Sequence, residues 1–364
     1  HLPSDSQVVY CGYQINAGTR NEEPGEEGLA HFCEHVTFKG TERRKAWHIL
    51  NCLESVGGDL NAYTNKEGTV YYSAILKEHI ARAVDLLSDI VFHSVYPQAE
   101  IDKEVEVICD EIESYNDSPA ELIYDEFENI LFKGSPLGHN ILGTAEQVRA
   151  FKTEDALRFT QKLYRPDNAI FFAYGDIDFK KLVKLIQKAL GECPKGRELA
   201  CSADCKSAET PTEERIAEET PTGETPTDER ITKETPTGET PTEEMEAGDA
   251  NHKVQSSKFN VQSKVAGQTI VMQKNTHQAH VMIGSRGYNA YDDKRTALYL
   301  LNNILGGPGM NSRLNVSLRE RRGLVYNVES NLTSYTDTGV FCTYFGCDPD
   351  DVDTCMRLVM KELK

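Results

Sequence analysis

The chain is 364 residues long and 39% hydrophobic, so it has enough apolar material for about two globular domains. No apolar run approaches the ~20 residues that a membrane-spanning helix needs, and the net charge of −19 argues against a nucleic-acid partner. Much of this charge is local, because residues 209–249 hold fourteen acidic side chains against three basic ones.

Alternating and helical apolar patterns predict a continuous series of elements in the first 194 residues. The series opens with strand, helix, helix, strand, strand and helix, and it continues with a long helical stretch, a shorter helix, a strand and a helix. In chain order we expect these elements at residues 8–17, around 31–35, 47–56, 60–64, 70–76, 80–92, 100–131, 155–163, 169–174 and 179–190. Such a mixture is typical of an α+β domain.

The middle of the chain repeats a short acidic sequence. Five copies of Glu-Thr-Pro-Thr lie within residues 209–242, starting at Glu209, Glu219, Glu224, Glu234 and Glu239. Such a segment has no apolar face to bury and cannot offset the entropy lost on ordering. We therefore expect residues 195–251 to be a disordered acidic linker or insertion between two domains.

After this linker the first six element types recur in the same order. We expect them at residues 281–287, 295–305, 313–321, 325–332, 340–345 and from 352 onward. The recurrence predicts two similar α/β-sandwich domains, 1–194 and 252–364, each with an antiparallel-rich sheet covered by helices. The second copy stops at Lys364 without counterparts of the last elements of the first, so we expect it to be C-terminally incomplete.

The most specific motif is His31-Phe32-Cys33-Glu34-His35. On a helix, residues four apart share a face, so His31 and His35 can reach one cation together. Glu34 borders the same face and is placed to meet a water rather than the metal. The spacing HxxEH is the reverse order of the commoner HExxH zinc motif, so it predicts half of a zinc hydrolase site.

A catalytic zinc site needs a third protein ligand and one open position. The best source is the acidic helix expected around residues 104–113, in which Glu104 and Glu111 are two turns apart and share a face. From composition alone, a merely acidic surface helix is an equally good interpretation.

Further blocks of sequence resemble a known family of peptidases. HFCEHVTFKGT, followed by LNAYT, VYYSAIL and EIDKEVEVICDEIE, resembles the pitrilysin-type inverted zincins, which include insulysin and mitochondrial processing peptidases. The resemblance covers nearly the whole chain outside the repeats, and it is strongest to short two-domain members. It implies that Glu111, 76 residues after His35, is the third ligand and that Glu104 supports a ligand from behind.

The second half carries Arg319 and Tyr326, seven residues apart, in the segment LRERRGLVY. This segment resembles the Arg-and-Tyr motif in the half of the family that lacks the metal. The resemblance implies that both side chains meet the substrate near the scissile carbonyl. The residues alone leave another interpretation open, an exposed helical Arg and a cross-strand Tyr.

Residues 60–64 predict an edge strand near the zinc site. An extended peptide can add to such a strand through main-chain hydrogen bonds. We therefore expect Asn61, Ala62 and Tyr63 to bind substrate.

These features predict a metalloendopeptidase with one Zn²⁺ per chain that hydrolyses extended or unfolded peptides. Zinc would lower the pKa of a water toward ~7, Glu34 would act as general base, and Arg319 and Tyr326 would stabilise the oxyanion. Two alternatives stay open: a non-catalytic structural subunit of the same family, and a peptide-binding or metal-sensing protein without turnover.

The resemblance also implies that two subunits, identical or related, pair to form a chamber around the peptide. The ten cysteines include no CxxC pair, so we expect a reducing compartment such as the cytoplasm or an organelle matrix. Small core residues are expected at Cys33, Cys52, Cys109 and Cys342. Structural or surface roles are expected for His79, His93, His139, His277 and His280.

Overall fold

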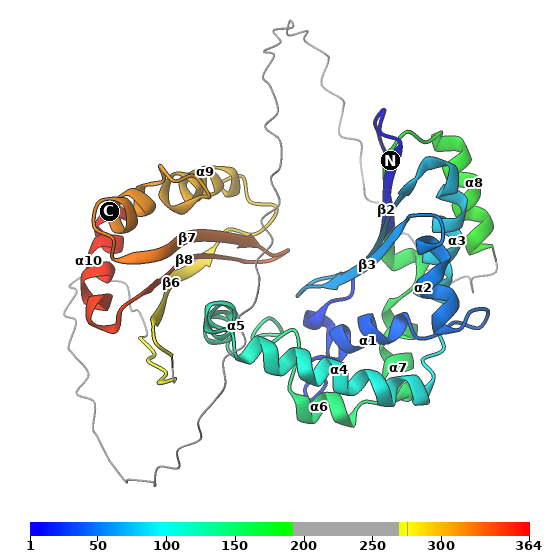
Figure 1. Cartoon of the computed structure of the whole chain (residues 1–364), viewed down its shortest axis with the longest axis horizontal. Helices are drawn as coiled ribbons and strands as arrows, with labels where there is room; N and C mark the ends of the chain where they lie inside the picture. Colours follow the sequence, from blue (N-terminus) through cyan, green and yellow to red (C-terminus); the bar gives the residue numbers. More distant parts are fainter. Residues whose placement is uncertain (192–268, 275) are drawn as a thin grey trace, which may run out of the picture. The chain divides into compact units, whose positions relative to one another are not determined.

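The computed structural model describes residues 1–191, 269–274 and 276–364, and Figure 1 shows how their helices and strands are arranged. The linker expected at residues 195–251, with its repeats, lies outside the described residues, as do residues 252–268 of the expected second domain. Within the described residues, the structure has no helix with the length and apolarity needed to cross a membrane.

The first sheet has five strands in the order β1-β5-β2-β4-β3. Among the described strands, β1 pairs parallel with β5, and the other pairs of this sheet are antiparallel. The strands are β1 (Leu2–Pro3), β2 (Val8–Ile15), β3 (Asp59–Thr64), β4 (Thr69–Leu76) and β5 (Ala169–Gly175). Because β3 ends this order, the edge strand predicted at residues 60–64 is confirmed.

Alternation along the strands explains which face of this sheet is covered. In β2, Val9, Cys11, Tyr13 and Ile15 are buried, while the residues between them include the exposed Tyr10. The buried face packs against α3 (Ile80–Phe92), and Figure 1 shows α2, α3 and α8 on one side of the sheet. Each large apolar side chain buried there contributes about 1.5–3 kcal/mol to stability.

The α-helices and strands of the first part match the predicted series with one correction and two additions. The long stretch expected at residues 100–131 is two helices, because Pro119 lacks an N–H and disfavours helical dihedrals at Ser118. The short elements β1 and α6 were not predicted. The helices are α1 (Leu29–Thr37), α2 (Ala46–Glu54), α3 (Ile80–Phe92), α4 (Gln98–Asn116), α5 (Pro119–Leu131), α6 (Ala145–Ala150), α7 (Thr153–Leu163) and α8 (Phe179–Leu190).

The second sheet repeats the core topology of the first. Its order β6-β8-β7 places the first, third and second strands of the unit side by side, as β2-β4-β3 does. The described elements are β6 (Ala279–Gly287), α9 (Arg295–Gly306), a π-helix (Asn315–Glu320), β7 (Val325–Ser334), β8 (Gly339–Cys347) and α10 (Val352–Glu362). Two similar α+β domains are therefore confirmed, and the helix expected at residues 313–321 is largely π-helical.

The cysteines in the described part of the chain are unpaired. Cys33, Cys109 and Cys342 are buried as predicted, and Cys52 is half-buried. Burial raises the pKa of the Cys33 thiol, so this side chain behaves as a small apolar core residue. The other three of the ten cysteines lie outside the described residues: Cys193, Cys201 and Cys205.

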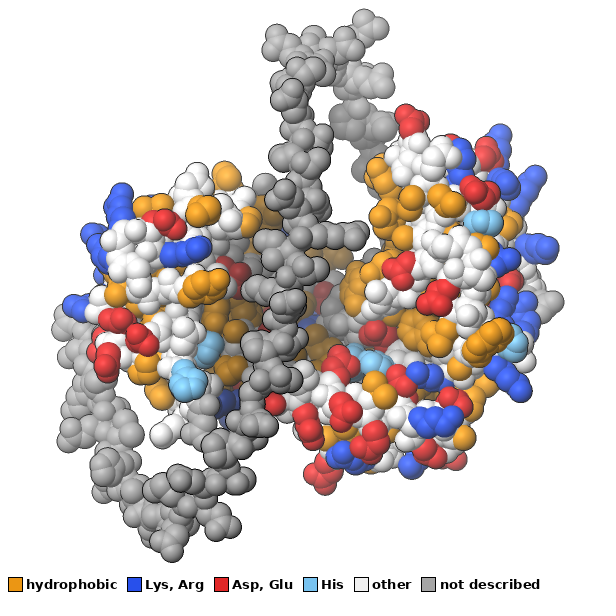
Figure 2. All heavy atoms as spheres, in the orientation of Figure 1, with side chains coloured by type: hydrophobic (Ala, Val, Ile, Leu, Met, Phe, Trp, Pro, Cys, Tyr) orange, Lys and Arg blue, Asp and Glu red, His pale blue; other side chains and the backbone are white. Residues whose placement is uncertain are grey.

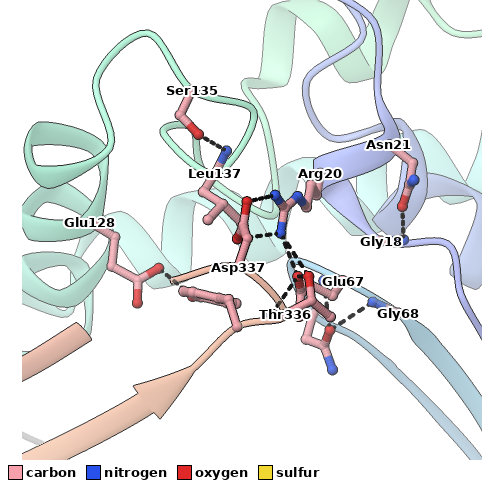
Figure 3. Close-up of polar contacts among 12 residues, drawn as sticks. Gly18, Arg20, Asn21, Glu67, Gly68, Glu128, Ser135, Leu137, Thr336 and Asp337 are labelled. Atoms are coloured by element: carbon pink, nitrogen blue, oxygen red, sulfur yellow. Dashed lines mark hydrogen bonds and ion pairs between the residues drawn. The ribbon is translucent and has the colours of Figure 1, made fainter. Parts of the chain in front are cut away.

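The turn between β3 and β4, which carries Glu67, meets the turn between β7 and β8, which carries Thr336 and Asp337. Both belong to one compact unit, and Arg20 contacts both turns (Figure 3). Arg20 Nη1 donates to Glu67 Oε1 at 2.5 Å and to Asp337 Oδ1 at 2.9 Å. The Thr336 backbone N–H donates to Glu67 Oε2 at 3.0 Å. The Asp337 side chain is 58% exposed, so its pair with Arg20 adds only about 0–1 kcal/mol to stability.

Candidate metal centre

Helix α1 presents two histidines on one face, as their spacing predicts. The ring centroids of His31 and His35 lie 4.6 Å apart, because residues four apart are neighbours on a helix surface. Phe32, Cys33 and Val36 are fully buried on the neighbouring faces and anchor the helix in the core. The two imidazoles therefore belong to a helix that the core holds in place.

Helix α4 brings Glu111 to this pair. Glu111 Oε2 lies 3.2 Å from His35 Nε2, and Glu111 Oε1 lies 3.7 Å from His31 Nε2. One ligand atom from each of the three residues lies within 4.8 Å of the other two. Two imidazole nitrogens and one carboxylate oxygen are a donor set of catalytic zinc sites, so the residues present fit Zn²⁺.

A second carboxylate orients one of the histidines. Glu104 Oε1 lies 3.1 Å from His35 Nδ1, and Lys39 Nζ donates to Glu104 Oε2 at 2.5 Å. Burial alone would raise the pKa of Glu104, but the hydrogen bonds with His35 and Lys39 lower it below its ordinary value. A carboxylate behind an imidazole fixes the tautomer and orientation of a metal-binding ring.

The outer face of α4 is acidic but does not face the metal centre. Asp102, Glu106, Asp110 and Glu113 are exposed, and Figure 2 shows acidic side chains gathered over this part of the molecule. Of the acidic residues on α4, Glu104 and Glu111 are the two that contact the histidine pair.

The two imidazoles differ in charge before metal binds. Burial and the neighbouring charge of His35 lower the pKa of His31 to about 4. Burial alone would also lower the pKa of His35, but its hydrogen bonds to Glu104 and Glu111 raise it to about 9. Without metal, these shifts favour a neutral His31 and a protonated His35 near neutral pH.

We expect zinc binding near pH 7 to release at least one proton, because His35 must lose its proton to bind metal and His31 has none to lose. Apparent affinity should rise with pH until the solution reaches the His35 pKa of about 9. Calorimetric titration in buffers of different ionisation enthalpy counts the released protons. A count near zero in the parent chain would show that His35 is already neutral.

Glu34 lies on the same helix and contacts β3. Thr64 Oγ1 donates to Glu34 Oε2 at 2.6 Å. Burial raises the pKa of Glu34, and the Thr64 hydrogen bond opposes that rise. No sequence motif points to Thr64. The alternation of β3 is the available signal, because it puts Thr64 on the same face as Leu60 and Ala62.

A groove with a volume of about 290 Å³ lies beside Glu34 and His35. Asn61 and Ala62 line it, whereas Tyr63 is not among its lining residues and is 51% exposed. Asn61 Oδ1 accepts a hydrogen bond from the Ala62 N–H at 2.8 Å. A peptide that pairs with this N–H must therefore displace the Asn61 side chain.

The structure does not bring Arg319 or Tyr326 to the groove. The Arg319 guanidinium lies 5.9 Å from the centroid of the Tyr326 ring, and the Tyr326 side chain is 83% exposed. Neither residue is among those that line the groove beside His35. The assignment of a catalytic role to these two residues stays a prediction.

The comparisons with known proteins agree with this geometry. Residues 2–145 match insulinase (peptidase family M16), and residues 150–364 match the peptidase M16 inactive domain. The chain belongs to peptidase family M16. The resemblance to the inverted zincins is thus confirmed, and the motif HxxEH lies in the first of the two matched M16 segments.

Relatives within M16 include both bacterial and mitochondrial proteins. An uncharacterized zinc protease of Streptomyces coelicolor is 30% identical over 362 residues, which are 100% of this chain and 68% of that protein. The mitochondrial-processing peptidase subunit beta of Saccharomyces cerevisiae is 37% identical over 195 residues, 54% of this chain and 42% of that protein. A protease from Helicobacter pylori shares the fold, with a TM-score of 0.75 at 20% identity, covering 98% of this chain and 74% of that one.

The boundary between the two M16 matches differs from the boundary between the two sheets. The second match begins at residue 150, whereas β5 pairs with β2 inside the first sheet. The boundary predicted at residue 194 stays a prediction, because residues 192–268 lie outside the described part.

Proposed function

We propose that this chain is a zinc metalloendopeptidase that hydrolyses extended or unfolded polypeptides. The observation that carries the proposal is the convergence of donor atoms from His31, His35 and Glu111 within 4.8 Å, one residue away from the carboxylate Glu34. The Streptomyces relative is named a zinc protease, which supports the same reaction here. A structural or metal-sensing role has no need of a carboxylate at Glu34.

Each group of the site would have a separate chemical role. Zinc, when bound, would make a water acidic enough to ionise near neutral pH. Glu34 would take the proton of the attacking water and return it to the leaving amine. Thr64 holds Glu34 Oε2, which leaves Oε1 for the water, and the raised pKa of Glu34 makes it a stronger base.

The substrate would lie along β3. This strand pairs with β4 on one side, and in the described sheet its other edge is unpaired. A peptide adding to that edge would exchange main-chain hydrogen bonds with β3 beside the groove lined by Asn61 and Ala62. Extended or unfolded segments fit this mode, because most main-chain N–H and C=O groups of a folded segment are already hydrogen-bonded.

Metal analysis combined with peptide cleavage tests the proposal. The purified chain should hold about one zinc, lose cleavage of an unstructured peptide after chelation, and regain it on addition of Zn²⁺. The control is the His31→Ala variant, which should neither hold zinc nor recover. Cleavage that survives complete removal of metal would contradict a zinc mechanism.

We also propose that two subunits pair and that Arg319 and Tyr326 act in the partner's site. Tyr326 is exposed and lies outside the groove of its own chain, and the yeast relative is named as one subunit of a peptidase. Mixing a Glu34→Gln subunit with a Tyr326→Phe subunit should then restore roughly a quarter of parental activity. No recovery after confirmed subunit exchange would show that Tyr326 does not act in trans.

A further inference from the structure

The N-terminus of the metal-binding helix α1 is capped in an unusual way. Its N-cap residue is Gly28, with φ 97°, which has no side chain to accept the free N–H groups of the first turn. The carboxylate of Glu22, six residues earlier, accepts hydrogen bonds from two backbone N–H groups at this end of the helix. Glu22 Oε2 accepts from the Gly28 N–H at 3.1 Å, and Glu22 Oε1 accepts from the Ala30 N–H at 2.7 Å.

Glu22 is a buried charge with its own partner. Its side chain is 1% exposed, and His139 Nε2 donates to Glu22 Oε2 at 2.9 Å. Burial raises the pKa of Glu22, while the hydrogen bonds from His139 and Ala30 oppose that rise. The His139 carbonyl in turn accepts from Lys66 Nζ, and Lys66 is 3% exposed.

Close backbone packing keeps His139 next to this turn. A Cβ added to Gly28 would lie 2.7 Å from the Leu142 carbonyl oxygen, and one added to Gly143 would lie 2.2 Å from the Glu27 carbonyl oxygen. The loop that carries His139 is therefore pressed against the start of α1. A shift of the first turn of α1 toward this loop would therefore cause a steric clash.

The two zinc ligands on α1 are oriented by different means. Glu104 holds His35 through Nδ1. The Nδ1 atom of His31 is buried and has no hydrogen-bond partner in the described structure. The His31 ring contacts His35 and Glu111 but has no carboxylate at Nδ1, so its position depends strongly on the backbone of α1. His31 directly follows Ala30, whose N–H is held by Glu22.

We propose that Glu22, supported by His139, is a positioning residue that sets zinc affinity by fixing the first turn of α1 under His31. This inference rests on the proposed zinc site. Glu104 holds the His35 ring directly, whereas Glu22 would act on His31 through the backbone of the first turn. The structural or surface role expected for His139 stays a prediction, and its partner Glu22 holds the N–H of the residue before His31.

The test is zinc affinity of the full chain, measured by competition with a chromophoric chelator. Glu22→Gln keeps the volume but turns an amide N–H₂ toward a backbone N–H, so the dissociation constant should rise about tenfold. Asp178→Ala is the matched control, because Asp178 caps α8 by accepting from the Lys181 N–H at 2.7 Å. This control should lower the melting temperature and leave the zinc constant unchanged.

A second variant keeps the proposal testable if Glu22→Gln does not fold. His139→Ala removes the donor to Glu22 but keeps the carbonyl that binds Lys66, and it should weaken zinc binding about threefold. In the Glu22→Gln background it should add little, because both changes act through one contact. A fall in melting temperature with the parental zinc constant in both variants would show that Glu22 is only a helix cap.

Hydrogen exchange of the metal-free protein separates this inference from the proposed function. Glu22→Gln should speed exchange of amides in the first turn of α1, and Asp178→Ala should not. A parent chain that binds no zinc would overturn the proposed function and the link to affinity. Unchanged exchange in α1 would overturn the positioning role of Glu22 whether or not zinc binds.

Discussion

Replacing Glu34 with glutamine is expected to abolish peptide hydrolysis while zinc stays bound. Glu34 contacts Thr64 and is not one of the three converging ligands, so the metal should not depend on its charge. A glutamine cannot accept the proton of the attacking water. Loss of a general base lowers turnover by about 10²–10⁴-fold. Steady-state cleavage of an unstructured peptide and metal analysis of the same preparation measure both effects.

Glu42→Gln is the matched control for this experiment. Glu42 is an exposed carboxylate a few residues beyond the end of α1, and it does not line the groove. Its variant should keep both turnover and zinc. If Glu34→Gln lost its zinc instead, Glu34 would be a ligand and the proposed proton transfer would be wrong.

The part of the site that lies on one helix could be predicted from the sequence. His31, Glu34 and His35 are close in the chain, and helical geometry alone fixes which of their side chains share a face. The structure places the histidine rings 4.6 Å apart, as this geometry requires. Helical spacing is enough to predict this part of the site, because all three residues belong to α1.

The residues that come from other elements could not be predicted in the same way. Glu111 is 76 residues from His35, and only the family resemblance selected it over a surface role. Lys39, Thr64 and Glu22 also contact the site residues or their helix, but each contact depends on tertiary packing. The alternation of β3 shows which face of the strand Thr64 occupies, but no local spacing shows that any of the three residues meets the site or its helix.

The fold shows the same limit at two places. Apolar periodicity continues across residues 117–119, so it predicted one helix where Pro119 begins a second. The turn at Asn315–Glu320 is a π-helix, and its composition is that of an ordinary helix. Both differences lie in backbone geometry that apolar spacing does not encode.

Replacing Glu104 with glutamine is expected to weaken zinc binding by about 10- to 100-fold. The carboxylate holds His35 through Nδ1 and is itself held by Lys39. A neutral amide orients the ring less firmly and no longer favours the imidazole charge, so fewer protons should be released when zinc binds near pH 7. Chelator competition gives the affinity, and calorimetry gives the proton count.

Glu100→Gln on the same helix is the control, because Glu100 pairs with the exposed Lys103 at 2.8 Å and does not contact a histidine. This variant should keep the parental affinity. At saturating zinc, Glu104→Gln should regain most of its turnover, because Glu104 supports a ligand and does not touch the attacking water. Parental zinc affinity in Glu104→Gln would show that packing of α1 alone orients His35, and that the hydrogen bond to Nδ1 is dispensable.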